Sequence, residues 1–384
     1  MQNFNYYNPV NIIFGRGTIS ELPNLISKDS KILMTYGGGS IKKNGIYAQV
    51  KKALKGYSIL EFSGIEPNPT YETCIKAVKI VKENDIDFLL AVGGGSVLDA
   101  TKFISAASKF NDGDPWKLLS EAAEVKSALP LASVITLPAT GSEMNCGAVM
   151  SKKSTNEKYP LADKYLFPQF SIIDPETTYS LPQKQVINGL VDTYVHVLEQ
   201  YVTYNENAPL QNRQAESILL TIHEIAEKVL TESENYDAKA DFFWCSTQAL
   251  NGIINCGLPQ DWTTHLIGHE LTALYGIDHA QSIAIVLPRL WYNQKENKAD
   301  KLIQYGKRVF NISDINRETA LNTIINKTKD FFESLGIKTN LSDYGINSED
   351  AAQKISQRFK ERGTILGERE NITPDDVKEI LLNC

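Results

Sequence analysis

The chain contains five histidines in 384 residues, and three of them fall within HLIGHELTALYGIDH (265–279). A fourth, His196, follows Asp192 by four residues in GLVDTYVHVLEQYV. Side chains four residues apart project from one face of a helix, so these two could bind one ion together, and His265 and His269 repeat the spacing. Three imidazoles and one carboxylate make a four-ligand site of the kind that holds Zn²⁺ or Fe²⁺.

The histidine pattern also fits roles other than metal binding. A single histidine is more often a hydrogen-bonded structural residue than a metal ligand. A zinc protease would carry HExxH, but HELTA at His269 and HEIAE at His223 both lack the second histidine. We expect His223 to be structural or exposed. Spacing alone favours His265 and His269 as a chelating pair, with His279, ten residues later, as a bystander.

Two glycine clusters follow strand-like runs in the first half of the chain, in YGGGSIKK (36–43) and VGGGSVLDATK (92–102). A strand that runs through glycines into a helix exposes backbone N–H groups at the helix N-terminus, where a phosphate can bind. Neither cluster is a GxGxxG or Walker A motif, and one such cluster alone is also typical of a tight turn. Two clusters on successive turns of one sheet favour phosphate binding, because both would open on the same edge.

Polar residues accompany the glycine clusters. Asp99 and Lys102 follow the second cluster at helical spacing, which an ion pair within the helix would also account for. The turn LPATGSE follows a third strand-like run, LASVITL, and brings the hydroxyls of Thr136, Thr140 and Ser142 to the same edge. The edge is therefore predicted to be polar as well as rich in exposed N–H groups.

The elements that must position these residues divide the chain in two. In residues 1–180, short apolar runs such as KILMTYGGG and DFLLAVGGG alternate with helical patterns such as TYETCIKAVKIVKENDID. This alternation predicts a mostly parallel sheet and a Rossmann-like α/β dinucleotide-binding domain. In residues 181–384 the strand patterns stop and apolar residues recur three and four positions apart, which predicts an all-α domain. Because the Asp and His pattern falls within these residues, this domain is expected to bind the metal and the substrate.

The composition of the chain limits the kinds of binding partner that are expected. A net charge of −7 and a pI near 5.4 argue against nucleic acid or an anionic membrane surface, and no run of 18 apolar residues is present, so a small-molecule substrate is expected. The five cysteines are scattered and form no CxxC pair, which indicates a reduced, intracellular protein. With no signal-peptide pattern at the start of the chain, the expected location is the cytoplasm.

Taken in order, GGGS-x2-D-x2-K, PATGSE, D-x3-H and H-x3-H-x9-H resemble the motifs of the iron-containing (group III) alcohol dehydrogenases. The similarity runs over nearly the whole chain and is greatest to the butanol dehydrogenase and NADPH-dependent aldehyde reductase branch. The resemblance implies a dehydroquinate synthase-like fold and a homodimer that pairs through NYYNPVNIIFG. It also implies four metal ligands, Asp192, His196, His265 and His279. His269 would then lie beside the metal as a candidate proton relay.

The resemblance also assigns the cofactor loops. The implied contacts to the adenosine ribose, the pyrophosphate and the path to the nicotinamide are, in that order, Gly37, Gly38 and Ser40; Gly94, Gly95 and Ser96; and Asp99, Thr136, Ser142 and Lys158. NAD-specific members usually carry an aspartate in the first loop, which repels a 2′-phosphate. No carboxylate occurs in Gly38-Gly39-Ser40, and Lys42 and Lys43 are near in sequence, so NADP(H) is predicted, with NAD(H) as the alternative.

The expected reaction is hydride transfer that interconverts primary, butanol-like alcohols and aldehydes with the help of one divalent metal, Fe²⁺ or Zn²⁺. Two alternatives are a dehydroquinate synthase-like or glycerol dehydrogenase-like enzyme and a nucleotide-sensing protein with a vestigial site. A synthase of that kind should carry a basic pocket for its phosphorylated substrate, and no cluster of Arg and Lys lies near the ligands in sequence. Intact ligand spacing argues against a vestigial site. Asp278 and Ala280 depart from the Pro and Gly common in the family, which affects the loop around His279.

Overall fold

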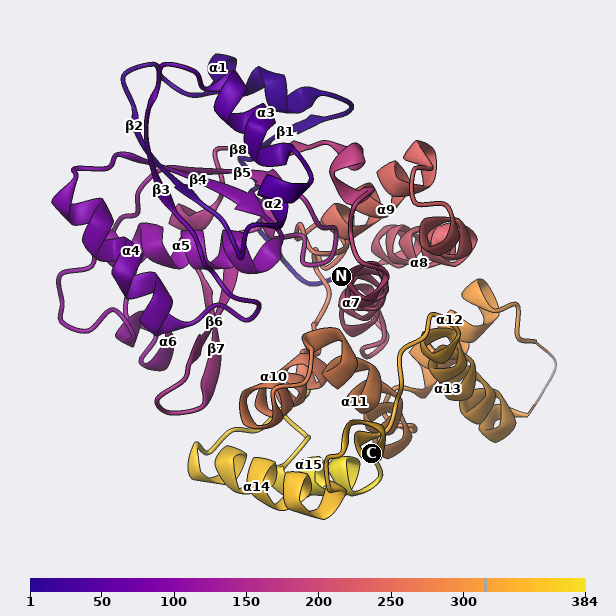
Figure 1. The fold of residues 1–384 in the computed structure, drawn as a ribbon. Coiled ribbons are helices and arrows are strands. Elements are labelled where there is room, and N and C mark those ends of the chain that lie inside the picture. Colours follow the sequence, from indigo (N-terminus) through magenta and orange to yellow (C-terminus); the bar gives the residue numbers. More distant parts are fainter. Residues whose placement is uncertain (314–315) are drawn as a thin grey trace. The chain divides into compact units, whose positions relative to one another are not determined.

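The computed structural model describes residues 1–313 and 316–384, which form two compact units (Figure 1). The α/β unit comprises residues 7–182 and 228–251, and the helical unit comprises residues 1–6, 183–227 and 252–384. A boundary placed after residue 180 therefore differs from this division mainly at residues 228–251. That segment holds α9 (Tyr236–Ala249), whose Phe243 packs on Ile135 and Ile173 of the sheet.

The α/β unit contains the strands of the protein together with most of its short helices. Its strands are β1 (Asn11–Phe14), β2 (Lys31–Thr35), β3 (Ser58–Phe62), β4 (Phe88–Gly93), β5 (Leu131–Ile135), β6 (Gly147–Lys152), β7 (Glu157–Ala162) and β8 (Phe170–Ile173). Its helices are α1 (Leu22–Leu25), α2 (Ser40–Lys43), α3 (Ile46–Ala53), α4 (Tyr71–Glu83), α5 (Gly95–Lys109), α6 (Lys117–Ser120) and α9, with 3₁₀ turns η1 (Thr18–Glu21), η2 (Ser142–Met144), η3 (Lys164–Leu166) and η4 (Pro175–Thr178).

Six parallel strands form the main sheet in the order β1-β8-β5-β4-β2-β3, and β6 and β7 form a separate antiparallel pair. β4, β5 and β8 are buried along their whole length, as their mostly apolar sequences predict, and the two buried serines, Ser133 and Ser171, hydrogen-bond each other. The strand order reverses between β2 and β4, because β3 lies on one side of β2 and β4 on the other. This is the position at which doubly wound sheets bind nucleotides, beyond the carboxyl ends of the strands.

The two faces of the sheet carry separate apolar cores, because successive side chains of a strand point to opposite faces. Leu33 and Leu89 pack with α4 and α5 on one face, and Met34 and Leu90 pack with α1 and α3 on the other. Figure 1 shows α4 and α5 and, across the sheet, α1 and α3. The predicted Rossmann-like α/β architecture is confirmed.

The helical unit is built around α11, which packs against α7, α10, α13 and α15. Its helices are α7 (Gln183–Tyr201), α10 (Thr263–Tyr275), α11 (His279–Asn293), α12 (Ala299–Val309), α13 (Arg317–Ser334), α14 (Ser348–Glu361) and α15 (Pro374–Leu382), with the turn η5 (Leu341–Tyr344), while α8 (Pro209–Thr231) contributes residues to both units. The prediction of an all-α second part is confirmed. In the part of the chain that the structure describes, none of the helices combines the length and apolarity needed to span a membrane.

Candidate metal centre and cofactor loops

Helix α7 brings the first two predicted ligands into the interior of the helical unit. Asp192 and His196 are only 4% and 5% exposed, and every residue from Gly189 to Tyr201 is buried. An ionised carboxylate at such a depth is costly unless it is paired or binds a metal. The position of Asp192 therefore calls for a compensating positive charge.

Helices α10 and α11 supply the other two predicted ligands. His265 lies in the first turn of α10, and His279 is the first residue of α11. α10 ends at Gly276 in the left-handed conformation and Asp278 caps α11, so the chain reverses direction within three residues. The two helices approach closely at Gly268, where an added Cβ would lie 2.9 Å from Oγ of Ser282. This contact brings together two histidines that are fourteen positions apart in sequence.

Three histidine side chains converge on one oxygen of the Asp192 carboxylate. Oδ1 of Asp192 lies 3.7 Å from the Nε2 atom of each of three histidines, His196, His265 and His279. These separations are too long for hydrogen bonds. They are close to the roughly 3.3–3.6 Å expected between two ligands of one tetrahedral ion with bonds of about 2.0–2.2 Å. The ligand atoms of Asp192, His265 and His279 all lie within 4.8 Å of one another.

The hydrogen-bonding state of these atoms also indicates a metal site. Oδ1 of Asp192 and Nε2 of His265 are buried, and neither has a hydrogen-bond partner in the structure. Buried polar atoms of this kind are rare in folded proteins and call for a ligand or an ion. A carboxylate oxygen and imidazole nitrogens are the donors that Fe²⁺ and Zn²⁺ accept, so the residues present fit a divalent metal.

The electrostatics of the cluster tie its members together. Burial alone would raise the pKa of Asp192, but the neighbouring histidines, His196 first among them, lower it to about 2. Burial would lower the pKa of His265, yet the carboxylates of Glu199 and Asp192 raise it to about 9. The cluster therefore contains an ionised carboxylate at neutral pH.

The other two histidines lie outside this arrangement. His269 is buried beside the cluster, with its ring centroid 5.2 Å from that of His279 and 6.3 Å from that of His265. His223 has Nε2 2.8 Å from Oη of Tyr194, and its ring centroid is 4.0 Å from that of Phe331. Burial lowers the pKa of His223 to about 4. The structure thus groups His265 with His279. Helical spacing alone favours a different pair, His265 and His269.

Glu199 lies outside the sequence motifs, yet it touches a proposed ligand. Its carboxylate oxygen Oε2 contacts Nδ1 of His265 within the interior of the helical unit. The available signal is its spacing, three residues after His196 and seven after Asp192, which places it on the same face of α7. A buried acidic residue at that spacing could be predicted to face the same site.

The predicted cofactor loops lie at one edge of the sheet. Gly37, Gly38 and Ser40 follow β2; Gly94, Gly95 and Ser96 follow β4; and Thr136 follows β5. These three parallel strands are adjacent, so their loops share the carboxyl edge, beside the reversal of strand order. α5 begins at Gly95, and the first N–H groups of a helix have no partner within it. The edge therefore offers donors to an anion.

Packing inside the protein restricts several of these glycines: an added Cβ would lie 3.1 Å from the carbonyl oxygen of Ile65 at Gly37 and 3.2 Å from Cβ of Leu137 at Gly94. A Cβ at Gly95 would lie 2.4 Å from Oγ1 of Thr140, so the residue must be small whether or not a phosphate binds. Gly38 is different, because an added Cβ there would meet nothing within 4 Å. Room for a phosphate therefore explains Gly95 only in part, whereas packing places no restriction on a side chain at position 38.

The polar residues around the second cluster hold the PATGSE turn in place. Nζ of Lys102 is buried and donates to Oγ and the carbonyl of Ser142 at 2.8 and 2.7 Å, and to the carbonyl of Gly147 at 2.7 Å. Asp99 accepts hydrogen bonds from Oγ of Ser142 at 2.8 Å and the backbone N–H of Val149 at 3.0 Å. Asp99 and Lys102 attract each other, as helical spacing suggests, but the hydrogen bonds of both side chains go to the turn and to β6.

Lys158 lies on β7 and is buried, and its Nζ donates to Oδ1 of Asn68 at 2.9 Å. Asn68 belongs to the loop after β3 and adopts the left-handed conformation, with φ of 55°. This amide does not stand out in the sequence, because it lies ninety positions from Lys158.

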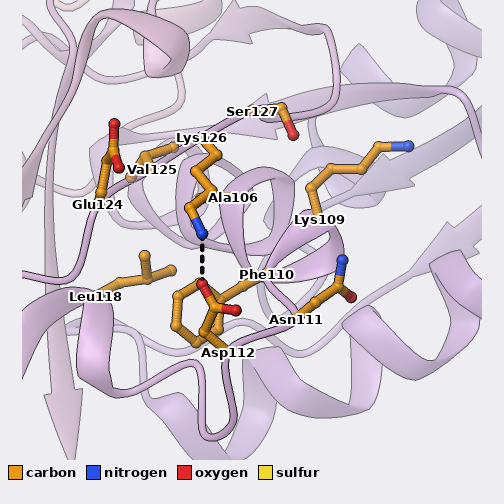
Figure 2. Close-up of a pocket in the computed structure, with 10 residues that line it drawn as sticks. All are labelled: Ala106, Lys109, Phe110, Asn111, Asp112, Leu118, Glu124, Val125, Lys126 and Ser127. Carbon is orange, nitrogen blue, oxygen red and sulfur yellow. Dashed lines mark hydrogen bonds and ion pairs between the residues drawn. The ribbon is translucent and has the colours of Figure 1, made fainter.

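A pocket of about 140 Å³ elsewhere in the α/β unit is not the candidate site (Figure 2). It is lined by the end of α5, by the residues 110–112 that follow it, by Leu118 and by residues 124–127, and none of the site residues predicted from sequence contributes to it. Figure 2 shows Nζ of Lys126 paired with Asp112 at 2.9 Å across this pocket. Both side chains are more than half exposed, so the pair is a weak surface interaction.

Comparisons with known proteins agree with the predicted family. The family model described as iron-containing alcohol dehydrogenase matches residues 9–175, and the model of the C-terminal part of the Fe-containing alcohol dehydrogenase family matches residues 186–384. The chain is 51% identical to the NADPH-dependent aldehyde reductase YqhD of Escherichia coli, over 99% of both chains. It is 43% identical to the NADP-dependent alcohol dehydrogenase 3 of Entamoeba histolytica, over 94% of both.

Solved structures give the same result. The crystal structure of Escherichia coli YqhD matches with a TM-score of 0.98 and 50% identity, covering 99% of this chain and 98% of that one. The NADH-dependent butanol dehydrogenase A of Thermotoga maritima matches with a TM-score of 0.94 and 36% identity, covering 99% and 98%. Since family models and close relatives span both units, the chain belongs to the iron-containing alcohol dehydrogenase family.

Proposed function

We propose that the chain is a metal-dependent, NADP(H)-linked alcohol dehydrogenase that reduces primary, butanol-like aldehydes to alcohols. The observation that carries this proposal is the convergence of three Nε2 atoms at 3.7 Å from Oδ1 of Asp192. Names of close relatives, an NADPH-dependent aldehyde reductase and an NADP-dependent alcohol dehydrogenase, support the reaction class.

The metal would be held by Asp192, His196, His265 and His279. When bound, the divalent ion supplies a Lewis acid that polarises the substrate oxygen and stabilises the charge that develops there. The side chain of His279 is 24% exposed, whereas those of the other three are at most 8% exposed. The buried residues therefore fix the ion from the protein side, and His279 borders the solvent.

His269 is the proposed proton carrier. Its buried ring lies next to that of His279, with 5.2 Å between the centroids, and an imidazole can donate or accept a proton near neutral pH. In this proposal a ring nitrogen of His269 delivers the proton that the substrate oxygen takes up after hydride transfer. The ligating histidines cannot do so, because their Nε2 atoms face the metal.

The cofactor would bind at the carboxyl edge of the sheet. The N-terminus of α5 offers its free N–H groups and positive dipole end to the pyrophosphate through Gly94, Gly95 and Ser96. The first loop, with Gly37, Gly38 and Ser40, would take the adenosine ribose, and no carboxylate there repels a 2′-phosphate. The remaining proposed contacts, toward the nicotinamide, are Asp99, Thr136, Ser142 and Lys158.

A steady-state assay tests the proposal. Protein purified without oxygen and loaded separately with Fe²⁺ or Zn²⁺ is mixed with butanal and either NADPH or NADH. We expect NADPH oxidation that depends on the metal and a higher kcat/KM with NADPH. An Asp192→Ala variant, which lacks the central carboxylate, should be inactive. Full activity after complete metal removal would contradict a metal-dependent reaction.

We also propose that the protein is a homodimer. β1 lies at the edge of the main sheet and pairs only with β8, so its outer side is open among the strands that the structure describes. Phe14 at the end of β1 and Trp244 are 38% and 43% exposed and contact each other edge to face at 5.9 Å. Open edge strands and exposed aromatics commonly mark association surfaces.

Light scattering tests the dimer directly. At micromolar concentration the mass should be twice that of the 42.8 kDa chain. A Phe14→Glu variant places a charge on the same edge and should favour the monomer, while the solvent-facing substitution Leu382→Glu, on α15, should not. A monomeric wild-type protein would contradict the proposal.

All five cysteines are free thiols in the structure, which supports our proposal that the enzyme works in the reducing cytoplasm.

A further inference from the structure

Glu199 is a buried carboxylate on the same helix as two of the proposed ligands. It lies on α7, three residues after His196 and seven after Asp192, and is only 3% exposed. The side chains at these spacings share one face of a helix. Glu199 is not one of the four proposed ligands, so metal binding by its own oxygens does not account for its burial.

The carboxylate of Glu199 binds the start of α10. Oε1 accepts the backbone N–H of Thr264 at 2.7 Å and that of His265 at 3.3 Å. Oε2 contacts Nδ1 of the His265 ring. Trp262, the N-cap residue of α10, makes no capping bond of its own. A carboxylate from α7 thus accepts the N–H groups of Thr264 and His265, while Oδ1 of Asp261 accepts that of Thr263 at 2.9 Å.

The contact with His265 has a consequence for the opposite side of its ring. A metal ion can bind only an unprotonated Nε2, and the ring then keeps its single proton on Nδ1, where the Glu199 carboxylate accepts it. Nε2 then carries the lone pair, and Nε2 is the atom that lies 3.7 Å from Oδ1 of Asp192. The two backbone bonds hold the carboxylate still, so the ring has one preferred orientation.

We propose that Glu199 is a positioning residue for the metal centre. It fixes the Nδ1–H tautomer and the orientation of His265, so that Nε2 points toward the metal. Carboxylates in this role also make the ring a better donor, and their loss typically weakens metal binding about 10- to 100-fold. The inference rests on the proposed metal-dependent function, because it needs the four ligands to bind an ion.

The substitution Glu199→Gln separates positioning from simple capping. The amide oxygen can still accept the two backbone N–H groups, which places the NH₂ group against Nδ1 of His265. Nδ1 must then accept, which moves the ring proton to Nε2 and blocks the lone pair that faces the metal. A residue that only caps α10 would lose stability on this change, with little effect on affinity for the metal.

The experiment measures the Kd for Zn²⁺ alone, in competition with a chromogenic chelator, on full-length protein freed of metal. We expect Glu199→Gln to raise the Kd about 10- to 100-fold. Glu216→Gln is the matched control, because Glu216 is also buried in the helical unit but bonds Tyr201 and Arg308 rather than a proposed ligand. Its Kd should stay near that of the wild type.

A second measurement uses the wild-type protein and therefore does not require a variant to fold. Nitrogen-15 NMR of histidine-labelled, metal-free wild-type protein, recorded at a pH at which the His265 ring is neutral, reports which ring nitrogen of His265 carries the proton. A proton on Nδ1 supports the proposal, and a proton on Nε2 overturns it. A Kd for Glu199→Gln within about twofold of the wild type would also overturn it. Failure of the wild type itself to bind one Zn²⁺ per chain would instead count against the proposed function.

Discussion

Replacing His279 or His269 with Ala distinguishes a ligand from a neighbour. In the structure Nε2 of His279 lies 3.7 Å from Oδ1 of Asp192 and belongs to the group of ligand atoms within 4.8 Å of one another. His269 lies beside His279, with 5.2 Å between the ring centroids. Helical spacing alone leads to the opposite expectation, in which His269 binds and His279 does not.

The size of the effect follows from the number of ligands. Four protein ligands that hold a divalent ion commonly contribute about 10–16 kcal/mol in total, so each is worth roughly 3 kcal/mol. Loss of His279 should therefore weaken metal binding by roughly 100-fold or more. Loss of His269 removes a neighbouring ring and no ligand atom, so metal affinity should change by less than about tenfold.

Metal content after dialysis against a chelator, measured by mass spectrometry, gives the comparison. We expect about one ion per wild-type and per His269→Ala chain, and a metal-free His279→Ala protein. His269→Ala should in addition lower kcat and change its pH dependence, because a proton carrier is missing. His223→Ala, which lies outside the cluster, serves as the control. A metal-free His269→Ala and a metal-loaded His279→Ala would refute the geometric assignment.

Three further predictions concern the cofactor, the packing and the stability. Gly38→Asp should lower kcat/KM with NADPH relative to NADH, because a carboxylate fits at this open position and repels a 2′-phosphate; Gly38→Asn is the neutral control, and an unchanged ratio would argue against the loop. Gly268→Ala places a Cβ 2.9 Å from Oγ of Ser282, and overpacking of about 1–3 kcal/mol should push α10 from α11 and weaken Zn²⁺ binding in a titration. For His223, a folded-state pKa of about 4 against 6.5 means that the unfolded chain takes up the proton first as pH falls. The free energy of unfolding should then drop by roughly 2–3 kcal/mol between pH 6.5 and 4, and the drop should be smaller by that amount in His223→Asn, measured by urea denaturation.

Local sequence patterns were sufficient to predict most of the fold. Mostly apolar runs such as LASVI predict strands buried on both faces, and β5 is buried throughout. The same patterns could not assign α9 to a unit, because a helical period shows that a helix has an apolar face but not which core it meets. Phe243 of α9 meets Ile135 and Ile173, which are far from it in sequence.

The site shows the same limit. The pair Asp192 and His196 is visible from spacing because both lie on one helix. His265 and His279 are brought together by the reversal of the chain between α10 and α11, which spacing does not reveal. Only the family resemblance predicted that these two histidines bind the same metal. Asp99 and Lys102 have the spacing of an intrahelical pair, yet each binds the PATGSE turn, because the turn supplies better placed partners.

The proposed metal site and the proposed cofactor loops lie in different units, and this separation has an evolutionary consequence. All four proposed ligands belong to the helical unit, whereas Gly38 and the other loop residues of the sheet edge belong to the α/β unit. A substitution at Gly38 changes a surface loop and leaves every hydrogen bond around Asp192 as it was. Lineages can therefore drift between phosphorylated and unphosphorylated nicotinamide cofactors by changing a few loop residues, while selection for metal retention acts on a different set of positions. Relatives named as NADPH-dependent and as NADH-dependent, both similar to this chain over nearly its whole length, are the outcome that such independence predicts.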